Sequence, residues 1–337
     1  MSKKSFIEKL FFLLLFICIF CLIIIGNYVN AYSQNVVSSE IPTVEIGAEE
    51  ISKEEIIAHE TEKIMSIDVS SGKTTEYNID LKNIAPILEK MNETQNFSTD
   101  LFLNNQSNNK YQDKKTFRAI PFKSLNYTYY TCINNEQVSS QKPICRITCN
   151  AYSPCTTGFL IGDKYLATAA HCVLNQDGTA FSNLSASAGY RNGTYLNTMG
   201  FNTIYYSNNW PTYGPASSFD WAIVELDGNY GSNVGVIYCT KYNNYSDMVN
   251  VSDSAWGYPG ESVNGEHLCY SNGSVSSANS WTFDSSCHVE GGFSGGPTRI
   301  SDNTAIGINI AKYSDYSLKS VRFNDNLFNL ILDLLNN

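Results

Sequence analysis

From about residue 119 onward, short apolar runs are separated by turn residues roughly every ten positions. The runs have the alternating pattern of β-strands; examples are residues 158–162, 165–168, 221–226 and 305–310. Such a series predicts an all-β barrel or sandwich. Only the stretch from Asp325 to Leu335 has helical spacing of apolar residues, so we expect one amphipathic helix at the C-terminus, packed on the β-structure.

The first 31 residues have the pattern of a secretory signal peptide. Lys3 and Lys4 give a basic start, the run from Leu10 to Ile25 is uncharged, and Ala31 ends an acceptable cleavage site. An uncleaved membrane anchor is the alternative, because the run is close to the lower limit for a span. We expect cleavage, bacterial export to an extracellular location, and no stable membrane association afterwards.

Residues 32–118 differ in texture from the rest of the chain. They lack cysteine and tryptophan, are rich in charge, and end in a polar Asn/Ser/Thr-rich stretch. A segment of this kind between an export signal and a cysteine-rich domain predicts a pro-region, with Lys114–Arg118 as a processing zone and residues 119–337 as the main domain. The alternative is a small independent domain that stays attached.

The distribution of cysteines indicates a disulfide framework. The chain has 10 cysteines; Cys18 and Cys21 lie inside the predicted signal. The eight that remain all follow residue 131: Cys132, Cys145, Cys149, Cys155, Cys172, Cys239, Cys269 and Cys287. An even number in an exported chain favours disulfides, although eight cysteines allow 105 pairings. A metal site is the alternative, but these eight form no Cys-x-x-Cys pair, and we expect no metal and no cofactor. Calcium bound by loop carboxylates stays open.

The overall composition excludes some classes of partner. With 43% hydrophobic and 16% charged residues the chain is expected to be globular. A net charge of −10 leaves no basic footprint for a nucleic acid. We expect a monomer.

The segment Glu290–Pro297 (EGGFSGGP) contains Ser294 as its only nucleophile. Glycines allow a sharp turn and close approach of the backbone. A serine in such a turn can present its hydroxyl beside bare backbone N–H groups, as acyl transfer requires. The alternative is an ordinary glycine-rich turn between strands, so the chain must supply a base and an acid.

His171 and Asp220 are the candidates for these two roles. His171 follows a predicted strand in the sequence TAAHC, which ends in Cys172; the natural disulfide partner of this cysteine is Cys155. Asp220 enters the apolar run 221–226, and a carboxylate at such a position needs a partner. Two rival aspartates stand in Asp-Gly turns, where the side chain is normally used by the turn.

The order of these residues separates two classes of hydrolase. Gly292-x-Ser294-x-Gly296 also fits the nucleophile elbow of α/β-hydrolases, in which the catalytic histidine follows the serine. No histidine follows Ser294 in this chain. The order His171, Asp220, Ser294 instead matches that of chymotrypsin.

On these motifs, residues 145–337 resemble the chymotrypsin-fold serine proteases, and more particularly the bacterial extracellular glutamyl endopeptidases. The matching segments are residues 155–162, 167–172, 191–194, 219–223, 257–260 and 291–297. The resemblance implies two six-stranded antiparallel β-barrels, with His171 and Asp220 on the first and Ser294 on the second. It also implies export as a pro-enzyme, hydrolysis of protein or peptide substrates by the Ser294–His171–Asp220 triad, and an oxyanion hole formed by the N–H groups of Gly292 and Ser294.

The sequence departs from the family at the positions that surround the serine. Phe293 stands where mammalian-type relatives have the aspartate that receives the freed N-terminal amine, so that activation mechanism is excluded. Asn309 and Val289 stand where glutamyl endopeptidases have a histidine and a small hydroxyl residue that bind a substrate carboxylate. His288 and Lys312 are candidate replacements in the specificity pocket; otherwise His288 only caps a loop. Preference for acidic residues is therefore a hypothesis. The alternatives to an enzyme are an inactive protease-fold binding protein and a surface-anchored protein.

Overall fold

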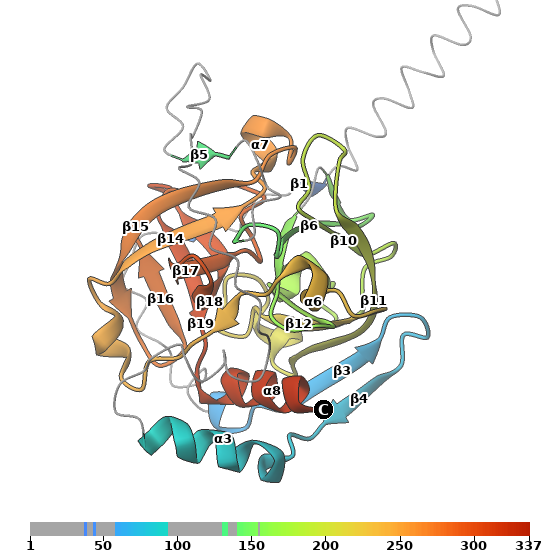
Figure 1. Cartoon of the computed structure of the whole chain (residues 1–337), viewed down its shortest axis with the longest axis vertical. Helices are drawn as coiled ribbons and strands as arrows, with labels where there is room; N and C mark the ends of the chain where they lie inside the picture. Colours follow the sequence, from blue (N-terminus) through green and yellow to red (C-terminus); the bar gives the residue numbers. More distant parts are fainter. Residues whose placement is uncertain (1–36, 39–42, 45–57, 94–129, 134–139, 154–155) are drawn as a thin grey trace, which may run out of the picture. The chain divides into compact units, whose positions relative to one another are not determined.

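The computed structural model describes residues 37–38, 43–44, 58–93, 130–133, 140–153 and 156–337 (Figure 1). The chain divides into two compact units, Met1–Ser38 and Ser39–Asn337. In the first unit only the two-residue strand β1 (Val37–Ser38) is described. The predicted signal peptide therefore lies outside the described residues, as does the Lys114–Arg118 processing zone. None of the helices in the described ranges is long and apolar enough to cross a membrane.

Six antiparallel strands form the first barrel. Their order is β10-β6-β8-β9-β12-β11, and a ladder between β10 and β11 closes the ring. The strands are β6 (Ile144–Thr148), β8 (Thr156–Leu160), β9 (Tyr165–Thr168), β10 (Ser185–Ala188), β11 (Asn197–Ser207) and β12 (Ala222–Leu226). Every residue of β8 and β9 is buried, which explains why these two segments have nearly continuous apolar or small residues.

Six further strands form the second barrel. The ring runs β18-β17-β14-β15-β16-β19 and is closed by pairing of β18 with β19. The strands are β14 (Ser252–Gly257), β15 (Cys269–Ala278), β16 (Thr282–Ser285), β17 (Pro297–Ser301), β18 (Thr304–Tyr313) and β19 (Leu318–Arg322). The predicted all-β class and the two six-stranded barrels are thus confirmed.

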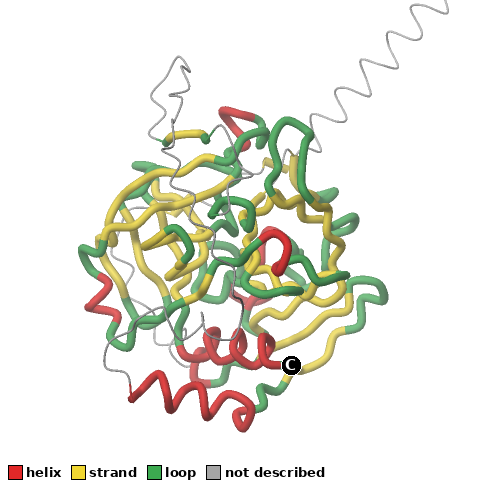
Figure 2. Tube along the Cα trace, in the orientation of Figure 1, coloured by secondary structure: helices red, strands yellow, loops and turns green. Residues whose placement is uncertain are grey.

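Short elements are attached to these barrels, mostly as the helical turns seen between the strands in Figure 2. Three short strands join the second barrel: β2 (Thr43–Val44) and β13 (Tyr238–Cys239) pair with β18, and β5 (Thr131–Cys132) pairs with β15. The other short elements are β7 (Tyr152–Ser153), η1 (Ala170–Cys172), α5 (Trp210–Tyr213), α6 (Gly231–Val234), η2 (Tyr245–Met248) and α7 (Gly260–Val263).

The C-terminal helix α8 (Asp325–Asn336) is confirmed. The side chain of Asn324 accepts a hydrogen bond from the backbone N–H of Leu327 and caps the helix. Its apolar side chains are buried: Leu327, Phe328, Leu330, Ile331 and Leu334. This burial is the packing that the helical spacing predicted.

Residues 58–93 of the predicted pro-region belong to the same compact unit as the barrels. This stretch forms β3 (Ile64–Asp68), β4 (Thr74–Tyr77) and α3 (Leu81–Glu93). β3 pairs with β11 and β4 with β3, so this hairpin extends the sheet of the first barrel. Helix α3 lies beside α8 (Figure 1). Whether residues 32–118 are removed stays a prediction.

One disulfide joins Cys132 to Cys269, which are paired residues of β5 and β15. Their connection was open at the level of sequence. The predicted Cys155–Cys172 bridge is not tested, because Cys155 lies outside the described residues. Cys172 is buried and forms no disulfide with any described residue.

Candidate active site

The pairing of two strands of the first barrel brings His171 and Asp220 together. Thr168, the last residue of β9, lies opposite Ala222, the first residue of β12. His171 follows β9 in the helical turn η1, and Asp220 precedes β12, so both side chains emerge at the same end of this strand pair. Both are buried, at 3% and 0% exposure.

The Asp220 carboxylate accepts three hydrogen bonds. His171 Nδ1 lies 2.8 Å from Oδ2, and the backbone N–H of His171 donates to Oδ1 at 3.0 Å. The backbone N–H of Ala216 donates to Oδ2 at 3.0 Å. Burial of a carboxylate is costly unless its oxygens are satisfied, and here they are.

Asp220 also affects the pKa of the imidazole. Burial of His171 acts to lower its pKa, because the imidazolium loses hydration. The negative charge and hydrogen bond of Asp220, together with Cys172, outweigh burial and raise the pKa of His171 well above its ordinary value. A raised pKa makes His171 a stronger base once it is deprotonated.

Ser294 lies in the loop between β16 and β17, on the second barrel. Gly292 and Gly295 on either side of it have φ angles of +101° and +79°. A Cβ at Gly292 would collide with the carbonyl oxygen of Tyr258, and one at Gly295 with the carbonyl oxygen of Thr157. Glycine is therefore required at both positions, which explains the composition of this segment.

The serine loop is held from both barrels. From the first barrel, the Thr157 backbone N–H donates to the carbonyl of Ser294 at 2.9 Å, and its hydroxyl donates to the carbonyl of Gly292 at 2.6 Å. From the second barrel, the backbone N–H of Gly295 donates to the carbonyl of Asn309 at 2.8 Å. The loop that carries Ser294 is thus fixed relative to the strand pair that carries His171.

Two polar atoms of this site lack a partner. Nε2 of His171 and Oγ of Ser294 are both buried and have no hydrogen-bond partner among the described residues. Buried polar atoms without partners are rare and call for an explanation, of which a catalytic role is one. Hydrogen bonds between catalytic groups are often long before substrate binds.

Asn309 does not face an open pocket. Its amide nitrogen donates to the carbonyls of Trp256 and Phe293 at 3.2 Å each, and its amide oxygen accepts from the Thr298 hydroxyl at 2.7 Å. The side chain is fully buried. It therefore ties the serine loop to strands of the second barrel.

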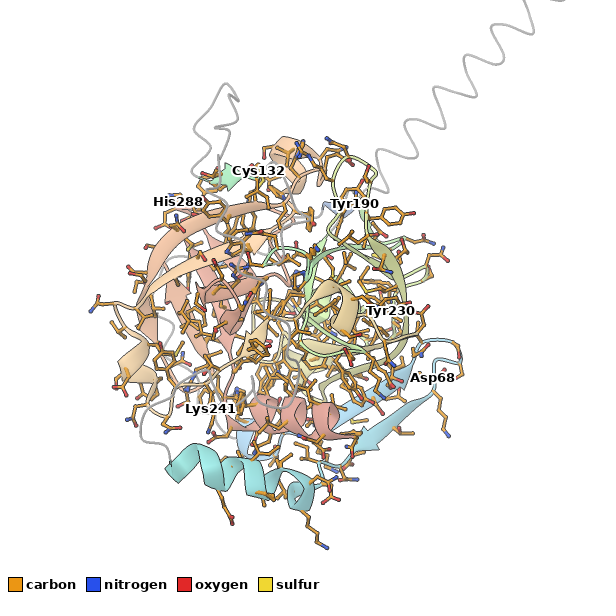
Figure 3. The ribbon with its side chains drawn as sticks, in the orientation of Figure 1. Asp68, Cys132, Tyr190, Tyr230, Lys241 and His288 are labelled. Carbon is orange, nitrogen blue, oxygen red and sulfur yellow. A yellow bond between two sulfur atoms is a disulfide. The ribbon has the colours of Figure 1, made fainter. Side chains whose placement is uncertain are left out.

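The other predicted pocket residues are Val289, His288 and Lys312, of which Val289 and Lys312 both contact Tyr316. Val289 is buried, and its backbone N–H donates to the carbonyl of Tyr316 at 2.9 Å. His288 is partly exposed, its backbone N–H donates to Ser271, and in Figure 3 it lies at the edge of the second barrel. Lys312 is nearly buried, and its Nζ lies 3.1 Å from the Glu261 carboxylate.

Carboxylates that sequence reasoning missed also lie beside the serine loop. Glu261 on α7 accepts a hydrogen bond from the backbone N–H of Gly291 at 3.1 Å. Glu290 accepts from the backbone and the hydroxyl of Ser262 at 3.0 and 2.6 Å, and burial raises the pKa of Glu290. Nothing in the local sequence distinguishes these residues from surface acids, because α7 and the loop are distant along the chain.

Phe293, which directly precedes Ser294, is fully buried. Its ring centroid lies 5.6 Å from that of Tyr130, whose hydroxyl also contacts Ser262. Tyr130 directly precedes β5, which the Cys132–Cys269 disulfide joins to β15. The Phe293 side chain is thus packed against an aromatic ring that the disulfide-linked strand positions.

The two barrels with this loop arrangement define a chymotrypsin-like fold. The profile of the trypsin family matches residues 133–324, and the chain therefore belongs to the trypsin family.

Relatives and solved structures agree with this assignment. An extracellular metalloprotease of Bacillus subtilis (strain 168) is 31% identical over 184 residues, which are 52% of this chain and 56% of that protein. A glutamyl endopeptidase of Bacillus licheniformis is 28% identical over 143 residues, which are 42% of this chain and 44% of that protein. The chain thus spans about half the length of these relatives.

Among solved structures, a Glu endopeptidase in complex with MPD matches with a TM-score of 0.56 and 21% identity, over 62% of this chain and 97% of that one. The protease Anisep from Arthrobacter nicotinovorans matches with a TM-score of 0.50 and 20% identity, over 59% and 99% of the two chains. At these identities the structural matches establish the fold.

The name of the Bacillus subtilis relative raises the question of a metal. In the ranges that the structure describes, no three His, Cys, Asp or Glu side chains gather into a group that could hold a metal ion.

Proposed function

We propose that this chain is a serine endopeptidase that hydrolyses peptide bonds through an acyl-enzyme, with Ser294 as nucleophile, His171 as base and Asp220 as the orienting acid. The observation that carries the proposal is the buried His171–Asp220 pair. Nε2 of His171 and the hydroxyl of Ser294 make no hydrogen bond to any described residue, and the loop that carries Ser294 is hydrogen-bonded to Thr157 of the first barrel. Family membership supports it.

The reaction would run in two halves. His171 Nε2 takes the proton of Ser294 as its Oγ attacks the peptide carbonyl, and the N–H groups of Gly292 and Ser294 stabilise the oxyanion. His171 then protonates the leaving amine. Water then attacks the acyl-enzyme while His171 Nε2 takes its proton. His171 returns this proton to Ser294 Oγ as the acid product leaves. Asp220 keeps Nδ1 protonated and stabilises the imidazolium throughout.

The test is covalent labelling of the secreted protein with a fluorophosphonate, followed by peptide mapping. We expect a single adduct on Ser294, no adduct in Ser294→Ala, and loss of peptidase activity in wild-type protein in proportion to the labelling. A Ser294→Ala variant with full activity would exclude the proposed triad. Absence of labelling in folded wild-type protein would favour an inactive binding protein.

We also propose that the enzyme prefers acidic residues directly before the scissile bond. Lys312 supports this preference, because it is a nearly buried cation close to the serine loop, as does the similarity to a glutamyl endopeptidase. Since Glu261 neutralises Lys312, a substrate carboxylate would have to compete with Glu261 or displace it. A peptide-library profile with a preference for Arg, Lys or aromatic residues alone would reject this part.

We further propose export by residues 1–31 and processing after the 32–118 segment, with a monomeric secreted product acting on proteins or peptides. N-terminal sequencing of the secreted form tests both cleavages, and light scattering of the same sample tests the oligomeric state.

A further inference from the structure

His59 lies in the predicted pro-region, yet only 6% of its surface is exposed. It is buried against the two barrels, which are called the catalytic unit below. Its ring stacks between Phe219 and Trp281, with centroid distances of 4.1 Å to both and interplanar angles of 30° and 3°. Phe219 precedes β12 of the first barrel, and Trp281 lies in the turn between β15 and β16 of the second. One imidazole therefore contacts both barrels.

The edges of the same ring are also in contact with polar groups. His59 Nε2 lies 2.7 Å from the hydroxyl of Ser218, and Nδ1 lies 3.5 Å from a carboxylate oxygen of Glu62. The Glu62 side chain is only 3% exposed. A polar ring is costly to bury unless partners are supplied. Nε2 has such a partner in Ser218, whereas Nδ1 makes no hydrogen bond to a described residue.

Two of the residues that His59 contacts, Ser218 and Phe219, belong to the loop directly before Asp220. The backbone N–H of Asp220 donates to the carbonyl of Ser217 at 3.1 Å, and that of Ala216 donates to the Asp220 carboxylate at 3.0 Å. Ser218 and Phe219 form the middle of this loop, directly before Asp220. Stacking on Phe219 and bonding to Ser218 therefore restrict the position of the carboxylate that orients His171.

The segment that carries His59 has its own attachments to the barrels. β3 and β11 pair along five residue pairs, from Thr203–Asp68 to Ser207–Ile64. Lys63 and Asn208 exchange two hydrogen bonds, at 2.7 and 2.9 Å, and the Asn209 amide donates to the carbonyl of Ala58 at 2.8 Å.

At the other end of the segment, the hydroxyl of Tyr77 donates to the buried Asp333 of α8 at 2.8 Å. Ile67 and Ile84 are buried at 2% and 0% exposure. These contacts do not depend on continuity of the chain between residues 94 and 129, so a cut there would leave them in place.

We propose that residues 58–93 remain bound to the catalytic unit in the active enzyme, and that His59 is a positioning residue that acts through Ser218 and Phe219 on Asp220. This inference rests on the proposed function. If the chain is cut within Lys114–Arg118, the product is therefore a two-chain enzyme, and residues 58–93 are not released.

The first test follows the segment in active enzyme. The full chain is secreted by an expression host, labelled under native conditions with a biotinylated fluorophosphonate, captured, and analysed by mass spectrometry after denaturation. We expect residues 58–93 in equal molar amount with the Ser294 adduct. Ser294-labelled protein that lacks the segment, from a preparation that was active before labelling, would overturn the inference and leave the proposed function intact. Failure of folded protein to label would overturn the proposed function instead.

The second test separates positioning from mere stability. His59→Phe keeps an aromatic ring between Phe219 and Trp281 but removes the bond to Ser218, and Ser218→Ala removes the same bond from the other side. We expect kcat per labelled site to fall roughly ten-fold in each, with KM within about two-fold of wild type, and no further fall in the double variant. The midpoint of the acidic limb of kcat/KM should also move to lower pH, because Asp220 then supports the imidazolium less well.

The matched control is Glu60→Gln, an exposed neighbour that should leave kcat and the pH profile unchanged. If His59→Phe lowers only the fraction of labelled enzyme, with kcat per site and the pH midpoint as in wild type, His59 has a structural role alone and the positioning claim is wrong. Unchanged kcat in a His59→Phe enzyme whose sites can all be labelled afterwards would have the same meaning.

Discussion

Asp220 binds both the ring and the backbone of His171: Oδ2 lies 2.8 Å from Nδ1, and Oδ1 accepts the backbone N–H of the same residue at 3.0 Å. Two bonds from one carboxylate fix the imidazole in position and in orientation. The pairing of Thr168 with Ala222 makes this arrangement possible, because it places the end of β9 beside the start of β12.

Replacement of Asp220 by asparagine should preserve the fold and reduce kcat by about 10⁴-fold. The amide is close in size, but an amide N–H facing Nδ1 favours the tautomer in which Nε2 carries the proton and cannot act as base. Steady-state kinetics with a peptide substrate, beside circular dichroism to verify folding, provides the measurement. A loss below about ten-fold would mean that Asp220 does not orient the base.

The pH dependence of kcat/KM should show an acidic limb with its midpoint above the ordinary histidine value of about 6.5. His171 must be neutral to accept the Ser294 proton, so activity is present above its pKa and is lost as the pH falls through it. Asp220 raises the pKa of His171, and the limb moves upward with it. An acidic limb centred well below pH 6.5 in the free enzyme would contradict this assignment.

Asn309→Ala should destabilise the protein and lower its activity. The change leaves the buried carbonyls of Trp256 and Phe293 and the Thr298 hydroxyl without the amide partner, at a cost of about 1–3 kcal/mol. Urea denaturation gives the free energy of unfolding, and the rate of fluorophosphonate labelling shows whether the loop still presents Ser294 for reaction. Asn272→Ala, at an exposed position of β15, is the control. Equal stability of the two variants would show that the amide does not hold the loop.

Lys312→Gln should reduce kcat/KM for substrates with glutamate before the scissile bond by about ten-fold or more, with a smaller effect on neutral substrates. Loss of a charge-assisted hydrogen bond to a substrate carboxylate is worth about 1.5–3 kcal/mol. Lys164→Gln, which breaks a comparable Lys–Glu pair on the first barrel, serves as the control. An equal loss of kcat/KM for all substrates would mean that Lys312 stabilises the loop and does not determine specificity.

Removal of the Cys132–Cys269 disulfide by alanine at both positions should lower the free energy of unfolding by about 2–5 kcal/mol, because the bridge spans 137 residues of sequence and its loss frees the unfolded chain. Thermal unfolding of the variant beside reduced and oxidised wild type provides the test. Identical melting of variant and oxidised wild type would show that the bridge does not contribute to stability.

The sequence by itself determined the β class, the C-terminal helix and the candidates His171, Asp220 and Ser294. Alternation of apolar residues reports burial of one strand face, and the positive φ of Gly292 is a local reason for glycine there. These signals need no knowledge of distant contacts.

Tertiary structure decided what depends on residues far apart in the chain. The amide of Asn309 holds the serine loop, Lys312 is paired with Glu261, and Cys132 is bridged to Cys269. His59, in a segment that composition set apart from the protease domain, is packed against the residues before Asp220. Composition describes only the average of a segment. The binding of residues 58–93 to the barrels depends instead on a few side chains and on the pairing of β3 with the edge of β11. Only the folded chain brings these groups together.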